Sequence, residues 1–223
     1  MKRIITIDGG AATGKSTSMV RLSRALGWHG ISTGHVYRAA TVLALTECIG
    51  PEEAAGQLVS RLQEGALSYD PHSHVYSLSQ PGLDEKPLTV GQLNSVEVSA
   101  RTPHYSRIPE VRAALLEFQR DLYQEPGLVA DGRDCGTVVY PDAVLKVWLE
   151  VDPVEAARRL HRGLGVSFEQ AYVDVIERNR ADRSRGVSPM TAAADAVVID
   201  TTRLTPDEVF AVLVELCRRK DLA

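Results

Sequence analysis

The sequence lacks the features that mark secreted, membrane-spanning or metal-binding proteins. Its three cysteines, Cys48, Cys135 and Cys217, are far apart and form no CxxC pair, which favours free thiols over disulfides. No apolar run approaches the roughly 20 residues that span a bilayer, and the first residues do not resemble a secretory signal. The histidines have no metal-ligand spacing. We therefore expect a cytoplasmic protein without a membrane segment.

The sequence also lacks an excess of positive charge. It has 25 lysines and arginines against 29 aspartates and glutamates, a net charge of −4 and a pI near 5.9. Such a chain has no overall attraction to nucleic acids or anionic membranes, so a bound anion must be held by a local arrangement of groups. The 223 residues, 44% of them hydrophobic, are enough to bury the core of one α/β domain with small inserted lobes.

Strands alternate with helices along most of the chain, which is typical of a parallel α/β sheet. The β-branched run at 3–8 stops at glycines and predicts a buried parallel strand. Further strands are predicted at 28–33, 127–131, 144–151 and 196–200. Helices are predicted at 15–26, 34–49, 51–65, 109–123, 153–162 (ending at Gly163), 168–185 and 206–219.

The stretch from 66 to 90 breaks this alternation. Short alternating segments at 67–69 and 75–78, separated by Asp-Pro and Pro-Gly turns, predict antiparallel strands. Antiparallel strands inside an otherwise alternating chain indicate a small inserted lobe and not a continuation of the main sheet.

A phosphate-binding loop is the clearest motif in the sequence. Residues 9–16 (GGAATGKS) fit G-x-x-x-x-G-K-[ST] at every fixed position, between a predicted strand and a predicted helix. The glycines allow backbone N–H groups to converge on an anion, and the helix N-terminus adds partial positive charge. Lys15 would reach the β and γ phosphates, and the Ser16 hydroxyl would ligate Mg²⁺. The loop predicts binding of a nucleoside triphosphate but leaves GTPase, motor, kinase and ligase open.

The arginines favour a kinase among these classes. The base-reading Asn-Lys-x-Asp of GTPases is missing, and an ATPase motor would normally be longer. Arginines occur instead in or after predicted elements, at Arg38, Arg112, Arg133, Arg178, Arg180, Arg183 and Arg185. In a doubly wound sheet the glycine loop and residues 131–134 (DGRD) would open into the same crevice. Guanidinium groups there would screen two phosphorylated substrates, although the run at 178–185 alone also fits a solvated helix face.

Together these motifs resemble the bacterial cytidylate kinase family over nearly the whole chain. The most specific match is residues 131–143 (DGRDCGTVVYPDA), which are similar to the family stretch DGRDxGTVVFPDA. Residues 5–16, 33–38 (TGHVYR) and the pattern at 176–202 are also similar to that family. The resemblance implies an α/β fold with a three-layer, parallel-sheet P-loop kinase core, a small antiparallel β insert and a helical lid.

The resemblance also implies how the chain is divided. The P-loop core would comprise residues 1–60 and 92–223, including a lid at about 161–185. The segment 61–91 would form the inserted lobe on the monophosphate side.

The resemblance implies roles for individual residues. Arg38, Arg133 and Arg185 would bind the acceptor's phosphate and, with Lys15, act in catalysis. The ATP-binding residues would be Gly9, Gly10, Ala11, Ala12, Thr13, Gly14, Lys15, Ser16 and Thr17, with Ser16 also on Mg²⁺. The substrate-binding residues would be Arg38, Thr102, Arg112, Arg133, Asp134, Arg178, Asp182 and Arg185.

Within the substrate set, the resemblance assigns base and sugar contacts. Asp134 and Arg112 would read the cytosine edge, because a carboxylate accepts from the exocyclic amine that uracil lacks. Arg178 and Asp182 would hold the sugar hydroxyls. Thr102 stands next to Pro103, where the family has a cytosine-contacting serine, and would replace that serine.

The implied activity is ATP-dependent phosphorylation of CMP and dCMP to the diphosphates by direct in-line transfer, with Mg²⁺. The implied partners are ATP, CMP and dCMP, with no nucleic acid polymer and no membrane, and we expect a monomer. Two alternatives remain open. One is a P-loop kinase for UMP or another small hydroxylated or phosphorylated metabolite. The other is a nucleotide-dependent switch, against which the DGRD segment and the lid arginines argue.

Overall fold

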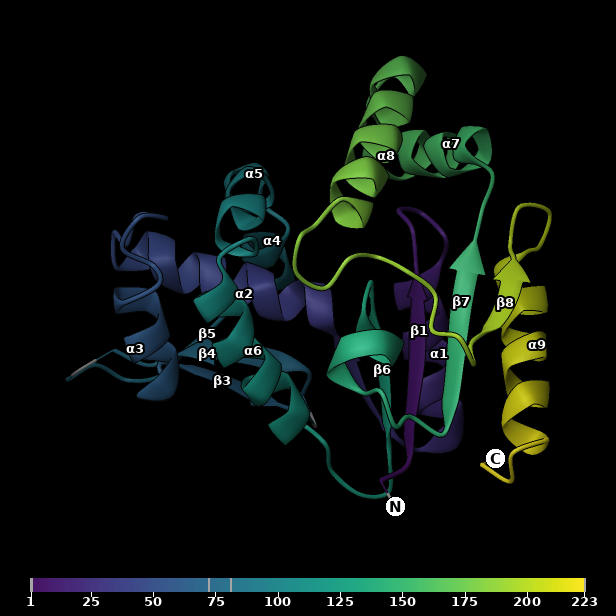
Figure 1. Cartoon of the computed structure of the whole chain (residues 1–223), viewed down its shortest axis with the longest axis horizontal. Helices are drawn as coiled ribbons and strands as arrows, with labels where there is room; N and C mark the ends of the chain where they lie inside the picture. The colour runs from purple at the N-terminus through teal and green to yellow at the C-terminus, as the bar shows by residue number, and fades with distance from the viewer. Residues whose placement is uncertain (1, 72, 81, 223) are drawn as a thin grey trace. The chain divides into compact units, whose positions relative to one another are not determined.

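The computed structural model describes residues 2–71, 73–80 and 82–222 and divides the chain into two compact units (Figure 1). The first unit joins Met1–Ile31 to Gln124–Ala223, and the second unit is Ser32–Tyr123. The first unit contains β1 (Ile4–Gly9), α1 (Lys15–Leu26), β6 (Leu128–Gly132), η1 (Cys135–Val139), β7 (Leu145–Glu150), α7 (Pro153–Leu164), α8 (Phe168–Arg183), β8 (Val197–Asp200) and α9 (Pro206–Arg218), and β2 (His29–Ser32) ends at the boundary.

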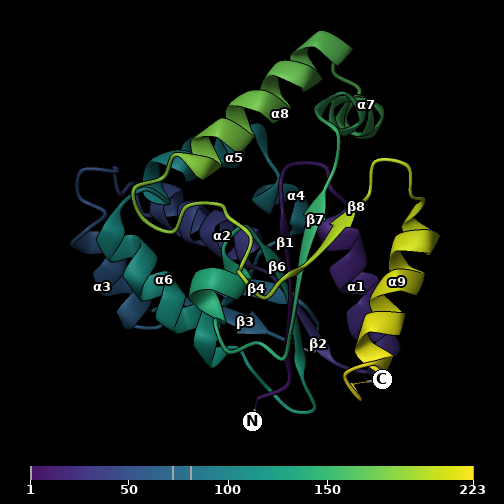
Figure 2. The same cartoon turned by 45° about the vertical axis from the view of Figure 1, so that its right-hand side comes forward.

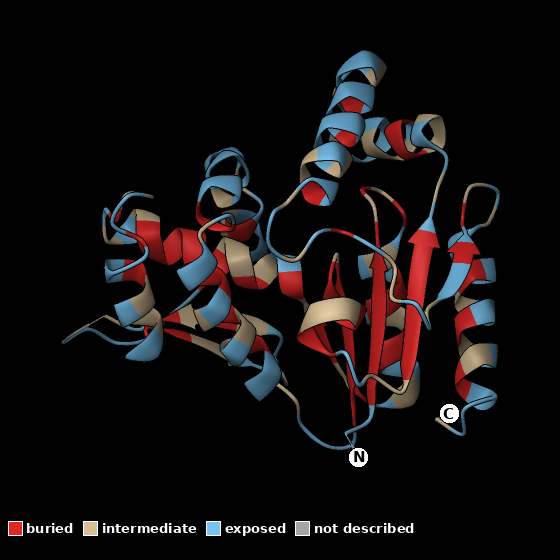
Figure 3. Ribbon diagram, viewed as in Figure 1, coloured by how far each residue is buried: buried red, intermediate tan, exposed pale blue. Residues whose placement is uncertain are grey.

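A five-stranded sheet forms the centre of the first unit, with the strand order β2-β6-β1-β7-β8. β1 runs parallel to both of its neighbours, so that Ile7 lies opposite Asp131 of β6 and Val147 of β7. All six residues of β1 are buried, as Figure 3 shows for this strand and for most of β6 and β7. This explains why β1 is a continuous β-branched run, because it has no solvent-facing side.

Helices α1 and α9 pack together against one face of this sheet, and they lie side by side in Figures 1 and 2. Leu22 of α1 and Leu213 of α9 are fully buried in one cluster with Ile5 and Ile7 of β1. Each buried leucine or isoleucine stabilises the fold by about 1.5–3 kcal/mol relative to an exposed one. The α/β class and the parallel sheet predicted from the sequence are confirmed.

The helix ends in the first unit follow local capping rules. Helix α1 spans the predicted residues, and it begins after Gly14 and ends at Gly27, both with left-handed backbone. Thr205 and Glu208 form a capping box at the start of α9. The predicted stop of the helix at Gly163 is wrong, since α7 continues until Gly165 adopts a φ of 69° and caps it. Within the described residues, no helix is long and apolar enough to cross a bilayer.

The second unit is built around α2 (Thr33–Thr46), a helix with eight buried residues. Elements that pack against α2 include α3 (Gln57–Gln63), α4 (Val90–Leu93), α5 (Val96–Tyr105), α6 (Pro109–Asp121) and β3 (Leu67–Asp70). β3 pairs with β4 (Val75–Leu78), which pairs with β5 (Lys86–Pro87), and both pairs are antiparallel. The predicted small antiparallel sheet is therefore present. It lies within 61–91, of which residues 72 and 81 are outside the described residues.

The helix predictions in the second unit were partly wrong. Residues 51–56 form successive turns, with the Gly56 N–H bonded to the Glu53 carbonyl, and a regular helix begins only at Gln57. Glycine is a poor helix former, and Gly56 marks the point where the turns give way to the helix. Helices α4 and α5 were not predicted, since α4 has four residues and α5 contains Pro103, which removes a backbone donor.

The end of β1 can accept only glycine. Gly9 has a φ of 150°, and a Cβ atom added there would lie 2.2 Å from the carbonyl oxygen of Leu149. We predict that Gly9→Ala lowers the free energy of unfolding by at least about 2 kcal/mol, measured by urea denaturation. The control is Gly163→Ala within α7, where a Cβ meets nothing within 4 Å and stability should stay equal or rise by up to about 1 kcal/mol. Equal stability of the two variants would contradict this account.

Candidate active site

The glycine loop between β1 and α1 has the backbone shape of an anion cradle. Gly9, Ala12 and Gly14 all have positive φ values, of 150°, 56° and 93°. Alternation of such residues with ordinary ones turns successive N–H groups toward one point. The hydroxyl of Thr13 donates to the Gly10 carbonyl at 3.2 Å and holds the curl in place.

The Lys15 ammonium lies against this loop. It donates to the Gly10 carbonyl and, at 3.3 Å, to the Thr13 hydroxyl. Burial lowers the pKa of Lys15 well below its usual value, and the positive charge of Arg133 lowers it further, whereas Asp131 opposes the shift. An anion beside Lys15 would reverse this effect, so the loop favours a phosphate as its ligand.

Ser16 and Asp131 bring a hydroxyl and a carboxylate together at the start of α1. The Ser16 Oγ donates to Asp131 Oδ2 at 2.8 Å. Both oxygens are ligands that Mg²⁺ prefers, and Mg²⁺ usually keeps several waters and takes the rest of its ligands from phosphates. In the described part of the chain no group of three or more His, Cys, Asp or Glu side chains is arranged to hold a metal. The pair therefore suits a magnesium ion that arrives with a nucleotide.

Asp131 is not among the predicted site residues, although the sequence carries a usable signal for it. It is an acid at the end of a predicted strand, and β6 turns out to lie directly beside β1. The ends of adjacent parallel strands meet at one edge of the sheet. The sequence predicts that the glycine loop and residues 131–134 share one crevice, but it does not show that β6 is the strand next to β1, on which the contact of Asp131 with Ser16 depends.

The DGRD turn after β6 lies beside the glycine loop. Arg133 Nη1 donates to the Gly9 carbonyl, and Arg133 Nε donates to Asp182 Oδ2 at 2.8 Å. Burial lowers the pKa of Arg133 to about 10, and the charge of Arg178 adds to that effect. Arg133 therefore remains protonated at neutral pH. The structure thus brings two predicted catalytic cations, Lys15 and Arg133, to consecutive carbonyls of one loop.

Asp182 joins the DGRD turn to the end of helix α8. One carboxylate oxygen binds Arg133 and the other accepts from Arg185 Nη2. Asp182 is 7% exposed, against 14% for Arg133 and 21% for Arg185. Arg178 is close enough that its charge lowers the pKa of both Lys15 and Arg133. Four of the predicted cations therefore gather in the first unit, with acids among them.

The three predicted residues of the second unit have their own surroundings. Arg38, on α2, donates to the Leu93 carbonyl at 2.8 Å and to the Ser99 hydroxyl at 2.9 Å. Arg112, on α6, is buried, and its guanidinium carbon lies 5.2 Å from the centre of the Tyr37 ring, within cation–π range. The Thr102 hydroxyl donates to the Val98 carbonyl of its own helix at 2.6 Å. Burial lowers the pKa of Arg38.

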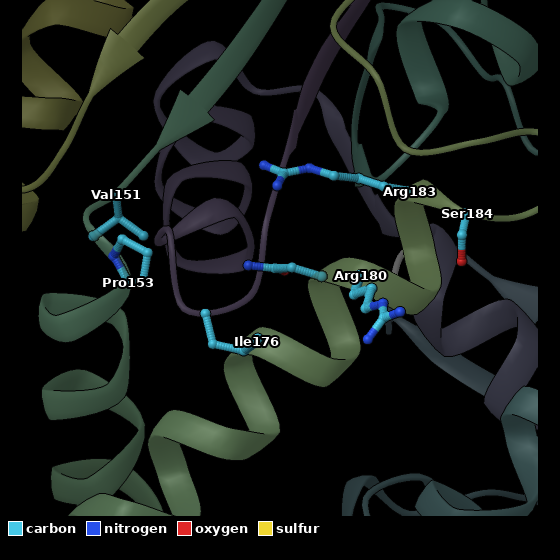
Figure 4. A pocket seen from close by; sticks show the side chains of 7 residues that line it. Val151, Pro153, Ile176, Arg180, Arg183 and Ser184 are labelled. Carbon is cyan, nitrogen blue, oxygen red and sulfur yellow. The ribbon is translucent and has the colours of Figure 1, made fainter.

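Helix α8, within the predicted lid, also touches the glycine loop. The Ala11 N–H donates to Asn179 Oδ1 at 2.8 Å. Beside this contact is a pocket of about 450 Å³, and Figure 4 shows Val151 and Pro153 on one side of it and two arginines across from them. The lining residues are Val151, Pro153, Ile176, Asn179, Arg180, Arg183 and Ser184. Its size and its arginines suit an anionic small molecule.

Two further residues, which were not predicted as site residues, donate hydrogen bonds to carbonyls of the glycine loop. The Thr201 hydroxyl donates to the Thr13 carbonyl at 3.3 Å, and Arg159 Nη1 donates to the Ala12 carbonyl at 3.4 Å. Arg159 also binds Thr201 through its carbonyl, at 2.6 Å. Threonine and arginine have no distinctive spacing here, so only the folded chain shows that they orient the loop.

Comparison with known proteins identifies the family to which this chain belongs. The sequence pattern of the family described as cytidylate kinase matches residues 5–219. The chain belongs to the cytidylate kinase family. This confirms the resemblance carried by the glycine loop and the DGRD stretch.

Relatives within the cytidylate kinase family match over almost their full lengths. A cytidylate kinase of Coxiella burnetii is 38% identical over 227 residues, which cover 99% of this chain and 94% of that protein. A cytidylate kinase of Salmonella arizonae is 36% identical over 224 residues, covering 97% and 96%. Among solved structures, an uncharacterized protein from Eubacterium ventriosum has a TM-score of 0.55 at 11% identity, covering 97% of this chain and 99% of that one. That likeness concerns the fold alone.

The buried carboxyl of Asp8, at the end of β1, predicts a pH dependence of stability. Burial raises its pKa from 3.8 to about 6, while N–H bonds from Gly136 and Cys135 act in the opposite direction. The folded protein thus keeps this proton to a higher pH than the unfolded chain. The resulting stabilisation is fully present below pH 3.8 and is lost as the pH rises through about 6.

We predict that the stability advantage of the wild type over Asp8→Asn shrinks by about 2–3 kcal/mol between pH 4 and pH 8. Urea denaturation of both proteins across this range measures it. A difference that stays constant with pH would show that the Asp8 carboxyl has an ordinary pKa.

Proposed function

We propose that this member of the cytidylate kinase family transfers the γ-phosphoryl group of ATP to the phosphate of CMP or dCMP. It is then an enzyme of the nucleoside monophosphate kinase class. The observation that carries the proposal is the placement of Lys15 and Arg133 on the adjacent carbonyls of Gly10 and Gly9. Two cations at one loop suit a reaction in which two phosphate groups must approach each other.

The glycine loop would bind the donor. Its N–H groups and Lys15 would hold the β and γ phosphates of ATP, as in other loops of this pattern. Ser16 and Asp131 would hold Mg²⁺, which neutralises charge on the β and γ oxygens when it is bound. The 2.8 Å contact between their side chains supports this assignment.

The arginines would bind the acceptor. As the family resemblance implies, Arg38, Arg133 and Arg185 would bind the monophosphate, and Arg178 and Asp182 would hold the sugar. Asp182 already binds Arg133 and Arg185, so it would also fix the direction of both guanidinium groups. Asp134, Arg112 and Thr102 would read the base, and the cytosine preference rests on the family and on the Asp134 carboxylate.

The reaction needs positioning and charge more than proton transfer. An oxygen of the acceptor's phosphate attacks the γ-phosphorus while the bond to the β,γ-bridging oxygen breaks, and ADP leaves with that electron pair. The attacking oxygen is already an anion, so no general base is required. Lys15 and Arg133 would stabilise the charge that spreads over the transferred group. Exclusion of water by the lid would limit hydrolysis of ATP.

Two segments of the chain would have separate roles in this reaction. Residues 61–91 would serve the monophosphate side and residues 161–185 would serve as the lid, which is supported by the contact of Asn179 with the glycine loop. The enzyme would work as a monomer in the cytoplasm, where ATP and nucleoside monophosphates are available.

The acceptor is tested by measuring ADP release with CMP, dCMP, UMP and AMP offered separately, with ATP and Mg²⁺. We predict turnover with CMP and dCMP and a kcat/KM for UMP at least about tenfold lower, because uracil lacks the amine that Asp134 would accept from. Turnover of another acceptor with CMP inert would reject the cytidylate assignment. Tight ATP binding without any acceptor-dependent ADP release would indicate a switch.

The two cations are tested by Lys15→Ala and Arg133→Ala. We predict that each lowers kcat at least about 100-fold, because each contact matters most in the charged transition state. The control is Arg219→Ala, whose side chain is 70% exposed directly after the end of α9 and should leave kcat unchanged. Near-wild-type turnover by either folded variant would remove that residue from the catalytic set.

A further inference from the structure

Asp8 is a buried carboxylate that the proposed function does not use. It is 5% exposed and is the next-to-last residue of the buried strand β1, just before the glycine loop. Its Oδ1 accepts from the Cys135 N–H at 2.9 Å, and its Oδ2 accepts from the Gly136 N–H at 2.8 Å. Both oxygens are therefore bound by backbone amides of the segment that directly follows Arg133 and Asp134.

The end of β1 holds the DGRD turn from two sides. In the sheet, Asp8 lies opposite Gly132, where the turn begins. The Asp8 side chain binds the amides after the turn, and the next residue, Gly9, accepts a hydrogen bond from the Arg133 side chain. The backbone on either side of Arg133 and Asp134 is thus fixed to one strand.

The space between Gly136 and the side chains of β1 and β7 is also tight. A Cβ atom added to Gly136 would lie 2.9 Å from Thr6 Oγ1, 3.2 Å from Lys146 Cδ and 3.4 Å from Asp8 Oδ2. Only glycine lets the amide at 136 come within hydrogen-bond distance of Asp8 without displacing these side chains. From Cys135 to Val139 the chain then forms a π-helix, a form that is frequent at functional sites.

We propose that Asp8 is a positioning residue that fixes the DGRD turn so that Arg133 and Asp134 meet the acceptor nucleotide. This inference rests on the proposed function. Asp8 itself would touch neither substrate; it acts through the two amides. A shift of about 1 Å in a positioned group can cost about 100-fold in rate, so a loosened turn would weaken acceptor binding.

A carboxylate suits this task better than its amide. Two N–H donors need two acceptor oxygens, and an ionised aspartate supplies both. Asparagine has one oxygen, and its NH₂ group would face the second backbone N–H, leaving a buried donor unpaired. Asp8→Asn therefore keeps the size of the side chain while removing one of the two anchors.

The decisive test is the steady-state kinetics of Asp8→Asn on the full chain. We expect the KM for CMP to rise about tenfold and the CMP-over-UMP ratio of kcat/KM to fall, because Arg133 and Asp134 lose their fixed directions. The KM for ATP should stay within about twofold, since neither amide belongs to the glycine loop. The control is Leu213→Ala, which opens a cavity on α9 in the cluster that contains Ile5 and Ile7 of β1, and which should leave both KM values and the base ratio unchanged.

A role for Asp8 in stability alone would lower activity with every acceptor equally and leave the KM for CMP unchanged, and that result would overturn the proposal. If wild-type enzyme does not phosphorylate CMP, the proposed function fails instead. A measurement without turnover separates the two cases: hydrogen exchange of the Cys135 and Gly136 amides should speed up at least about tenfold in Asp8→Asn. Unchanged exchange at both amides would refute the anchoring itself.

A second variant tests the same contact between β1 and the segment after the DGRD turn if Asp8→Asn does not fold. Gly136→Ala should raise the KM for CMP in the same direction, because its Cβ meets Thr6 Oγ1 at 2.9 Å. Adding Thr6→Ala removes that atom and should restore part of the loss. An unchanged KM for CMP in folded Gly136→Ala would count against the proposal.

Discussion

Two partly buried cations, Lys15 and Arg133, lie against consecutive carbonyls of one loop, and this placement is costly without an anion. Burial lowers the pKa of both groups, and each lies near Arg178 as well. The chain offsets part of this cost with its own acids, since Asp131 opposes the shift at Lys15 and Asp182 binds Arg133. A nucleotide's phosphates would supply the remaining charge, which is why the arrangement is suited to binding them.

The parallel sheet makes this placement possible. β1 and β6 are adjacent and run in the same direction, so the glycine loop and the DGRD turn leave the sheet at the same edge. Local packing then fixes the details: Gly9 must approach the Leu149 carbonyl, and Asp8 binds the amides that follow the turn. The fold thus brings two segments more than 100 residues apart in sequence into contact, as the bond between Gly9 and Arg133 shows.

The parts of the fold and of the site that depend on neighbouring residues could be predicted from the sequence. The glycine loop and the buried run of β1 set the first strand and helix, and α1 has the predicted bounds. The family resemblance carried by residues 131–143 is confirmed. The features that could not be predicted depend on contacts between residues that are far apart in the sequence. The pairing of Ser16 with Asp131, and the support of the loop by Arg159 and Thr201, follow from strand order and side-chain direction. The turns at 51–56 depend on local bonding that helix propensity does not resolve.

In this account, Lys15 and Arg133 act together on one continuous chain of phosphates. Calorimetric titration with an adenosine–cytidine dinucleotide joined by a polyphosphate tests it, because such a ligand carries both nucleotides at once. We expect one molecule to bind per chain and its Kd to rise at least about 30-fold in each of Lys15→Ala and Arg133→Ala, with the losses in the double variant not additive, as for groups that share a ligand. An affinity that falls in Lys15→Ala but is unchanged in Arg133→Ala would contradict the account.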